Sequence, residues 1–110
     1  MKELINTVHL LAVEELNKAN KKFPQFHSRH EGIGVLDEEI WEMGEELRRF
    51  NKANIDLHEA VYNDFDCEKA LRSAELSMSA ALAEGVQVLA MLKKFRCFLD
   101  KEEKQNEKLD

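Results

Sequence analysis

Residues 67–99 read CEKALRSAELSMSAALAEGVQVLAMLKKFRCFL, and this stretch decides the fold class. Its apolar and small side chains recur three and four residues apart: Leu71, Ala74, Met78, Ala81, Gly85, Val88, Leu92, Phe95 and Leu99. This spacing is typical of one face of an α-helix. At 1.5 Å per residue the helix is about 50 Å long, which exceeds the diameter of a compact chain of 110 residues. We therefore expect part of the stripe to pack on another copy of the chain.

The same periodicity predicts an amphipathic helix over about residues 2–21, which Pro24 ends, and another over about residues 28–50. Ser28 and Glu31 have the S-x-x-E form of a capping box. Residues 55–62 favour a short helix, and Asp66 is expected to cap the long final helix. The prediction is an all-α, oligomeric bundle of three long helices and one short helix. It forms a single domain over residues 1–100, and the charged tail 101–110 is expected to fray.

Composition excludes several function classes. Sixteen Lys and Arg against 22 Asp and Glu give a formal charge of −6, which disfavours nucleic acid as a partner. We find no apolar run of 18 residues and expect no membrane-spanning segment. Cys67 and Cys97 form no C-x-x-C motif, so we expect a reduced, cytoplasmic chain with buried structural thiols.

The chemistry that remains is that of carboxylates, since the chain has no P-loop, no G-x-G-x-x-G and no Glu-x-x-His. At about 100° per residue, Glu39, Glu42 and Glu46 line one border of the apolar stripe of the second helix. Like charges there cost energy unless a cation compensates them. Glu84 is the single acidic residue within Ala80–Phe95 and projects beside the apolar arc. Shared binding of a hard cation such as Mg²⁺ is one interpretation, and an ordinary solvated acidic face is the other.

Three stretches of the chain carry a family resemblance. They are Phe23-Pro24-x-Phe26-x-Ser28-x-His30-Glu31-Gly32, Leu36-x-Glu38-Glu39-x-x-Glu42 and Glu84-x-x-Gln87-Val88-x-Ala90-Met91. Together they resemble the MazG-type all-α NTP pyrophosphohydrolases, over about residues 10–98. The family pattern is E-E-x-x-E on one helix and E-x-x-D on a later one. These acids hold Mg²⁺, with Mn²⁺ as an alternative, and the metal bridges a nucleoside triphosphate. Water then attacks and releases pyrophosphate and a nucleoside monophosphate.

The resemblance implies roles for individual residues. Glu39, Glu42, Glu84 and Gln87 would be the metal ligands, although Gln87 stands where the family usually has Asp. An amide oxygen can bind Mg²⁺ but brings no charge. Glu38 or Glu39 would accept the proton of the attacking water. The separation of Glu42 from Glu84 is also longer than usual, so residues 51–66 resemble an insertion.

Substrate contacts would come from Arg29, His30 and Lys93, for which ordinary surface or helix-end roles are the alternatives. The implied partners are a nucleoside triphosphate and a second copy of the chain, in a homodimer or homotetramer. The implied role is the cleansing of nucleotide pools. Two other functions stay open: a dUTPase-like nucleotide hydrolase, and an inactive helical module for oligomerisation or regulation. Gln87 and the insertion favour the inactive module.

Overall fold

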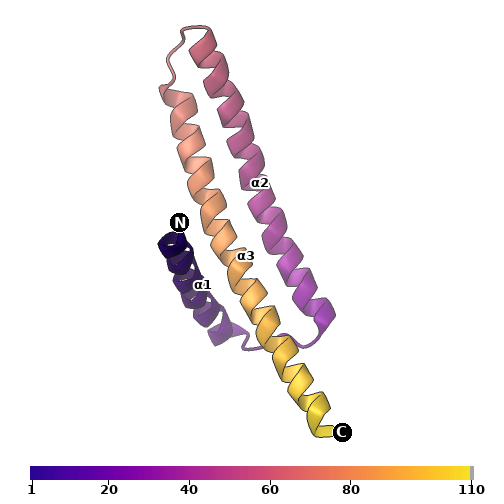
Figure 1. The fold of residues 1–110 in the computed structure, drawn as a ribbon. Coiled ribbons are helices and arrows are strands. Elements are labelled where there is room, and N and C mark those ends of the chain that lie inside the picture. Colours follow the sequence, from indigo (N-terminus) through magenta and orange to yellow (C-terminus); the bar gives the residue numbers. More distant parts are fainter. Residues whose placement is uncertain (110) are drawn as a thin grey trace. The chain divides into compact units, whose positions relative to one another are not determined.

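The computed structural model describes residues 1–109, and the side chains of residues 1–108. It contains three helices, α1 (Lys2–Lys22), α2 (Arg29–Tyr62) and α3 (Glu68–Leu109), and no strand among the described residues (Figure 1). The all-α prediction is confirmed, but the separate short helix over residues 55–62 is wrong. Residues 51–54 contain neither Pro nor Gly, and Ala53 is buried, so α2 continues through them without a break.

The helix ends follow the local sequence closely. At the start of α2 the Ser28 hydroxyl accepts a hydrogen bond from the Glu31 amide at 3.0 Å. The second half of the expected capping box differs, because the Glu31 carboxylate pairs with Nδ1 of His27 at 2.9 Å. The Asp66 carboxylate accepts from the Glu68 amide at 3.0 Å and so caps α3 as predicted.

The chain divides into two compact units, and both α2 and α3 pass from one to the other. Unit 1 comprises residues 1–39 together with the chain from Val86 onward, and unit 2 comprises Ile40–Gly85. A single domain over residues 1–100 stays a prediction. The tail that we expected to fray is helical as far as Leu109. One contact that holds it is the ion pair between Arg29 Nη2 and Glu102 Oε1, at 2.6 Å.

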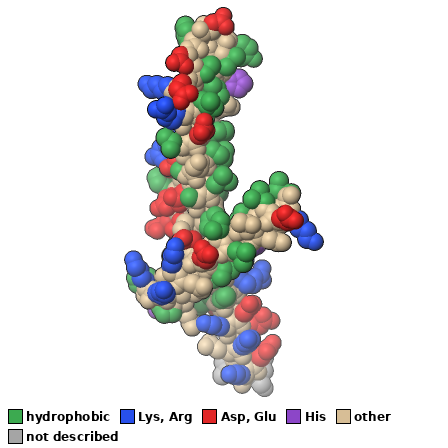
Figure 2. All heavy atoms as spheres, turned by 90° about the vertical axis from the view of Figure 1, so that its left-hand side faces the viewer, with side chains coloured by type: hydrophobic (Ala, Val, Ile, Leu, Met, Phe, Trp, Pro, Cys, Tyr) green, Lys and Arg blue, Asp and Glu red, His purple; other side chains and the backbone are tan. Residues whose placement is uncertain are grey.

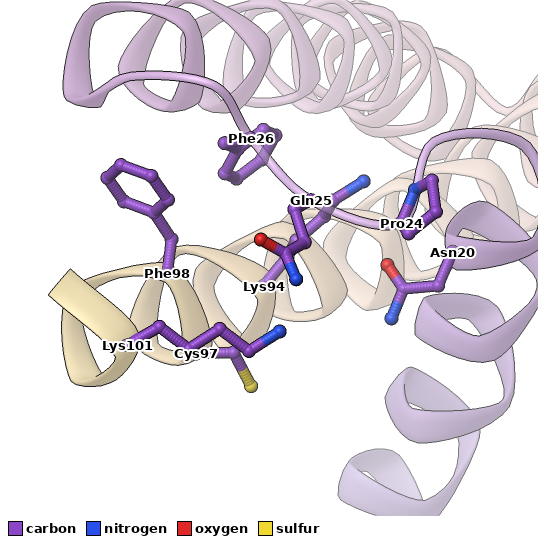
Figure 3. A pocket seen from close by; sticks show the side chains of 8 residues that line it. All are labelled: Asn20, Pro24, Gln25, Phe26, Lys94, Cys97, Phe98 and Lys101. Atoms are coloured by element: carbon purple, nitrogen blue, oxygen red, sulfur yellow. The ribbon is translucent and has the colours of Figure 1, made fainter. Parts of the chain in front are cut away.

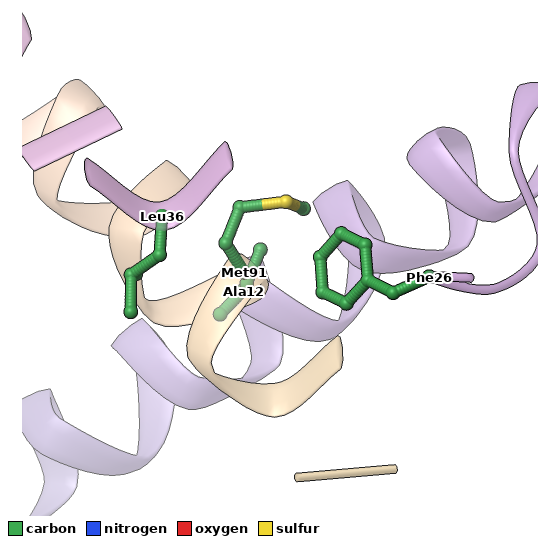
Figure 4. Close-up of a cluster of buried hydrophobic side chains, with 5 residues drawn as sticks. Ala12, Phe26, Leu36 and Met91 are labelled. Atoms are coloured by element: carbon green, nitrogen blue, oxygen red, sulfur yellow. The ribbon is translucent and has the colours of Figure 1, made fainter. Parts of the chain in front are cut away.

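The core of unit 1 is small and draws on all three helices and the connector before α2. It consists of five buried side chains, four of which are labelled in Figure 4: Ala12, Phe26, Leu36, Ala90 and Met91. Gly32 of α2 lies against this cluster, because a Cβ added there would come within 2.6 Å of the Phe95 ring. Phe26 is the anchor of the connector, with its ring centroid 6.2 Å from that of Phe95.

Unit 2 is a helical hairpin, in which the second part of α2 runs antiparallel to the first part of α3 (Figure 1). The turn between them includes Asp64, whose φ of 55° is in the left-handed region. The buried side chains of this unit are all alanines: Ala53, Ala60, Ala74 and Ala81. Larger apolar side chains remain on its surface.

One helix in the described part of the chain is long and apolar enough to cross a membrane, judged by length and composition alone. It is the stretch Glu68–Lys108, in which the best 18-residue window has a mean hydropathy of 1.2. Core helices of soluble proteins pass the same test, so the expectation of no membrane-spanning segment stays a prediction.

Candidate metal site

Three of the predicted ligands come together on α2 and α3. One carboxylate oxygen from each of Glu39, Glu42 and Glu84 lies within 4.8 Å of the others. Glu39 and Glu84 are half-buried and Glu42 is exposed. Three carboxylate oxygens at this separation form an arrangement that suits a hard divalent cation. The proximity of these three acids agrees with the interpretation of shared cation binding, and their role as metal ligands stays a prediction.

Small side chains explain why Glu84 comes close to Glu42. Ala81 and Gly85 flank Glu84 on α3, and Ala81 is buried in the seam between the two helices of unit 2. A Cβ added at Gly85 would lie 3.6 Å from Sδ of Met43 on α2, which is ordinary contact distance. At the level of Glu84, α3 therefore presents small residues, and the Met43 side chain of α2 reaches one of them.

The electrostatics of Glu84 reflect this crowding. Burial raises the pKa of Glu84, and the negative charge of Glu42, a hydrogen bond with Glu42 and the charge of Glu46 raise that pKa further. Protonation of Glu84 would relieve this repulsion, because it removes one of the charges. A divalent cation would relieve it more completely, because it compensates all the charges at once.

The other acids of α2 near this group of three have different surroundings. Glu45 and Glu46 pair with Arg48 and Arg49, one turn further along α2. Glu46 is therefore already compensated in part. Glu38, the predicted proton acceptor, is exposed and does not belong to the group of three.

Gln87 has a partner outside the carboxylate group. Its Nε2 donates a hydrogen bond to Oε2 of Glu15 on α1, at 2.8 Å. This bond, together with Lys18, lowers the pKa of Glu15. Gln87 therefore connects α1 to α3 within unit 1, and its role as a metal ligand stays a prediction.

The three predicted substrate-binding residues all lie in unit 1. Arg29 Nε donates a hydrogen bond to Oε1 of Glu102 at 2.9 Å. His30 is exposed in the first turn of α2. Lys93 is half-buried and lines an open hollow with Leu16 and Arg96. Their contacts with a substrate stay predictions.

One buried cation was not expected from the sequence, where Lys94 had the pattern of an ordinary surface residue. Lys94 is only 6% exposed. Its Nζ donates to the backbone oxygen of Phe23 at 2.5 Å and lies 4.9 Å from the centroid of the Phe26 ring. Burial lowers the pKa of Lys94, and the charge of Glu31 opposes that effect. Lys94 thus fixes the connector between α1 and α2.

A cavity of about 130 Å³ adjoins Lys94, between the connector and α3 (Figure 3). Asn20, Gln25 and Lys101 contribute polar groups to its wall, and the Asn20 Oδ1 atom is buried without a hydrogen-bond partner. Cys97 also lines the cavity and is exposed, while Cys67 is half-buried. The expectation of two buried thiols is therefore wrong.

The burial of Lys94 and the exposure of Cys97 depend on where the connector crosses α3. No pattern in the sequence predicts where the connector crosses α3. Comparison with known proteins adds no further restraint, since no family model, curated protein or solved structure matches this chain.

Proposed function

We propose that the protein is a divalent-cation-dependent hydrolase of nucleoside triphosphates that releases pyrophosphate and a nucleoside monophosphate. The observation that carries the proposal is the convergence of Glu39, Glu42 and Glu84 from two helices. Acids on one helix would form a charged strip of the common solvated kind. Glu84 instead comes from a second helix, where its neighbours are small or apolar, and its ionisation is opposed there.

The residues of the cluster have distinct parts in this proposal. Glu39, Glu42 and Glu84 bind Mg²⁺, for which Mn²⁺ is an alternative. When bound, the cation supplies charge neutralisation for the phosphates and lowers the pKa of a coordinated water. Glu38, exposed one residue before Glu39, or Glu39 itself accepts the proton of the attacking water. Gln87 would add a neutral oxygen, provided that its hydrogen bond to Glu15 is given up.

An assay of pyrophosphate release tests the proposal. The purified protein is incubated with Mg²⁺ or Mn²⁺ and a panel of ordinary and modified nucleoside triphosphates. We expect release for at least one nucleotide, together with loss of release in a Glu42→Gln variant. Glu75→Gln is the matched control, because Glu75 is an exposed acid of α3 outside the cluster. A folded protein that releases no pyrophosphate with any nucleotide contradicts the proposal.

A specific observation favours a second candidate, an inactive helical module of the same fold. Gln87 stands at the position where the resembled family has Asp. Its side-chain amide donates a hydrogen bond to Glu15 and does not point to a cation site. A module of this kind would retain the helices without turnover. The assay of pyrophosphate release separates the two candidates, because the hydrolase releases pyrophosphate and the inactive module releases none, and titration calorimetry with Mg²⁺ measures in addition whether the chain binds the cation.

A further inference from the structure

The cavity beside the connector of unit 1 has an unusual wall for a chain of this charge. Two lysines, Lys94 and Lys101, line it, and no acid of the described chain does. In the whole sequence Asp and Glu outnumber Lys and Arg by 22 to 16. Figure 2 shows side chains of both charges interspersed on the surface of the last turns of α3. The cavity differs from this surface because its only charges are positive.

Neither lysine is neutralised by a neighbouring carboxylate. Lys94 and Lys101 form no ion pair with an acid of the described chain. Burial lowers the pKa of Lys94, and the opposing charge of Glu31 comes from a separate hollow, which Glu31 lines with Met91. The Lys94 ammonium has three donors, and the backbone oxygen of Phe23 accepts from one of them. A buried charge is costly unless a counter-charge or further hydrogen bonds compensate it.

The α1 side of the cavity offers an acceptor that lacks a donor. Asn20 lines the cavity, and its Oδ1 atom is buried without a hydrogen-bond partner in the described chain. Figure 3 shows the amide groups of Asn20 and Gln25 and the Lys101 side chain directed to the space between the connector, α1 and α3. A buried amide oxygen needs an N–H or O–H group. A ligand that satisfies the whole wall therefore carries negative charge and a hydrogen-bond donor together.

Water satisfies only part of this wall. A water molecule can donate to Asn20, but it brings no charge to the two lysines. Hydrogen phosphate brings both, because it is an anion that keeps at least one O–H group at neutral pH. Its size also agrees with the cavity, which has a volume of about 130 Å³. A cavity of about 150 Å³ accommodates benzene, which is larger than phosphate.

We propose that this cavity binds inorganic phosphate in its hydrogen phosphate form. Lys94 and Lys101 attract the charged oxygens, the Gln25 amide donates to one of them, and the phosphate O–H donates to Oδ1 of Asn20. The site is separate from the candidate metal site, since none of the three clustered glutamates lines it. It needs no divalent cation and does not rest on the proposed hydrolase activity.

Titration calorimetry with sodium phosphate at neutral pH, without divalent cations and at constant ionic strength, tests the site. We expect saturable binding of one phosphate per chain. Sulfate should bind about tenfold more weakly or worse, because it has a similar shape and charge but no proton to donate to Asn20. A parent that binds no phosphate at millimolar concentration, or binds sulfate equally well, overturns the proposal.

A pair of lysine variants tests the location of the charge. Lys101→Met should raise the dissociation constant for phosphate about fivefold or more, because it removes a positive charge beside the anion. Lys104→Met is the matched control, since Lys104 is an exposed residue of α3 outside the cavity. It should bind phosphate as the parent does. Equal effects of the two substitutions overturn the proposal.

The two cysteines report where the anion lies in the unmodified chain. Cys97 is exposed and lines the cavity, whereas Cys67 does not line it. Phosphate should slow the alkylation of Cys97 by iodoacetamide and leave the rate at Cys67 unchanged, as measured by mass spectrometry. Unchanged alkylation of Cys97 in the presence of bound phosphate overturns the assignment to this cavity.

Asn20→Leu tests the donor requirement, because it replaces the unpartnered amide with an apolar group of similar size. We expect an unfolding temperature no lower than that of the parent and a loss of the preference for phosphate over sulfate. A less stable variant, or a preference that is retained, contradicts this role of Asn20. Methyl phosphate distinguishes the free ion from a phosphate ester, and tighter binding of the ester than of inorganic phosphate overturns the assignment to the free ion.

Discussion

Replacing Glu84 with Gln separates a metal site from an ordinary acidic surface. Oxygens of Glu42 and Glu84 lie within 4.8 Å of each other. Two unit charges at that distance repel by about 1 kcal/mol at the dielectric constant of water, and by ~3 kcal/mol at an effective value of 20. Glu42 is exposed, so the lower figure applies. We expect Glu84→Gln to raise the free energy of unfolding by about 1 kcal/mol at neutral pH without divalent cations.

The sign of this effect depends on pH. The pKa of Glu84 is raised above its ordinary value of 4.5 in the folded chain. Below pH 4.5 the carboxyl is protonated in both states and costs nothing. As the pH rises from 4.5 through the folded-state pKa, the unfolded chain releases the proton first, and folding stability falls. The advantage of Glu84→Gln should therefore appear over that window and be absent at lower pH.

Adding Mg²⁺ should make the parent chain more stable than Glu84→Gln. At a hundredfold excess over its dissociation constant, a cation that binds only the folded state adds about 2.7 kcal/mol. The parent gains this stabilisation and Glu84→Gln does not. Thermal unfolding followed by circular dichroism measures both arms, with about 4 °C expected per kcal/mol. Glu75→Gln should behave as the parent in each arm. The reasoning is refuted if Glu84→Gln is less stable than the parent without divalent cations. It is also refuted if Mg²⁺ leaves the unfolding temperature of the parent unchanged.

Three further predictions concern stability. Gly32→Ala places a methyl group 2.6 Å from the Phe95 ring and should cost about 1–3 kcal/mol in chemical unfolding. A Cβ at Gly34 would have no neighbour within 4 Å, so Gly34→Ala should instead stabilise the folded chain by about 1 kcal/mol. Equal effects of the two substitutions would show that the contact between Gly32 and Phe95 is wrong. Ser28→Ala removes the cap of α2 and should cost about 1 kcal/mol by the same measurement. Lys94→Met tests the lowered pKa of Lys94. The free energy of unfolding of the parent should rise as the pH approaches 10.5, because the unfolded chain binds more protons than the folded chain in that range. A parallel rise in the variant contradicts this.

The sequence predicted the helices well, because their periodicity is a local property. The three-four spacing marked α1 nearly to its ends and α3 as far as Leu99, although α3 continues to Leu109. Residues 51–54 were the exception, since they lack an apolar repeat and resembled a connector. Within this stretch Ala53 is buried, so its small side chain packs inside unit 2. A buried alanine in a polar stretch cannot be distinguished from an exposed one by sequence alone.

The candidate site was predictable in part for a different reason. Glu84 was conspicuous as a lone acid among apolar neighbours, and such a residue needs either a proton or a counter-charge. The hydrogen bond between Gln87 and Glu15 could not be foreseen, because it joins residues 72 positions apart. The burial of Lys94 was hidden for the same reason, since it depends on the path of the connector over α3.

The alanine seam of unit 2 has a consequence for which ion the carboxylates would prefer. Ala81 is buried one turn before Glu84, where its small side chain permits a close approach of α2 to α3, and the oxygens of Glu42 and Glu84 lie within 4.8 Å of each other. Mg²⁺ holds its ligands at about 2.0–2.1 Å, and Ca²⁺ at about 2.3–2.6 Å. Under the proposed function, a narrow helix spacing would therefore favour the cation with the smaller ionic radius.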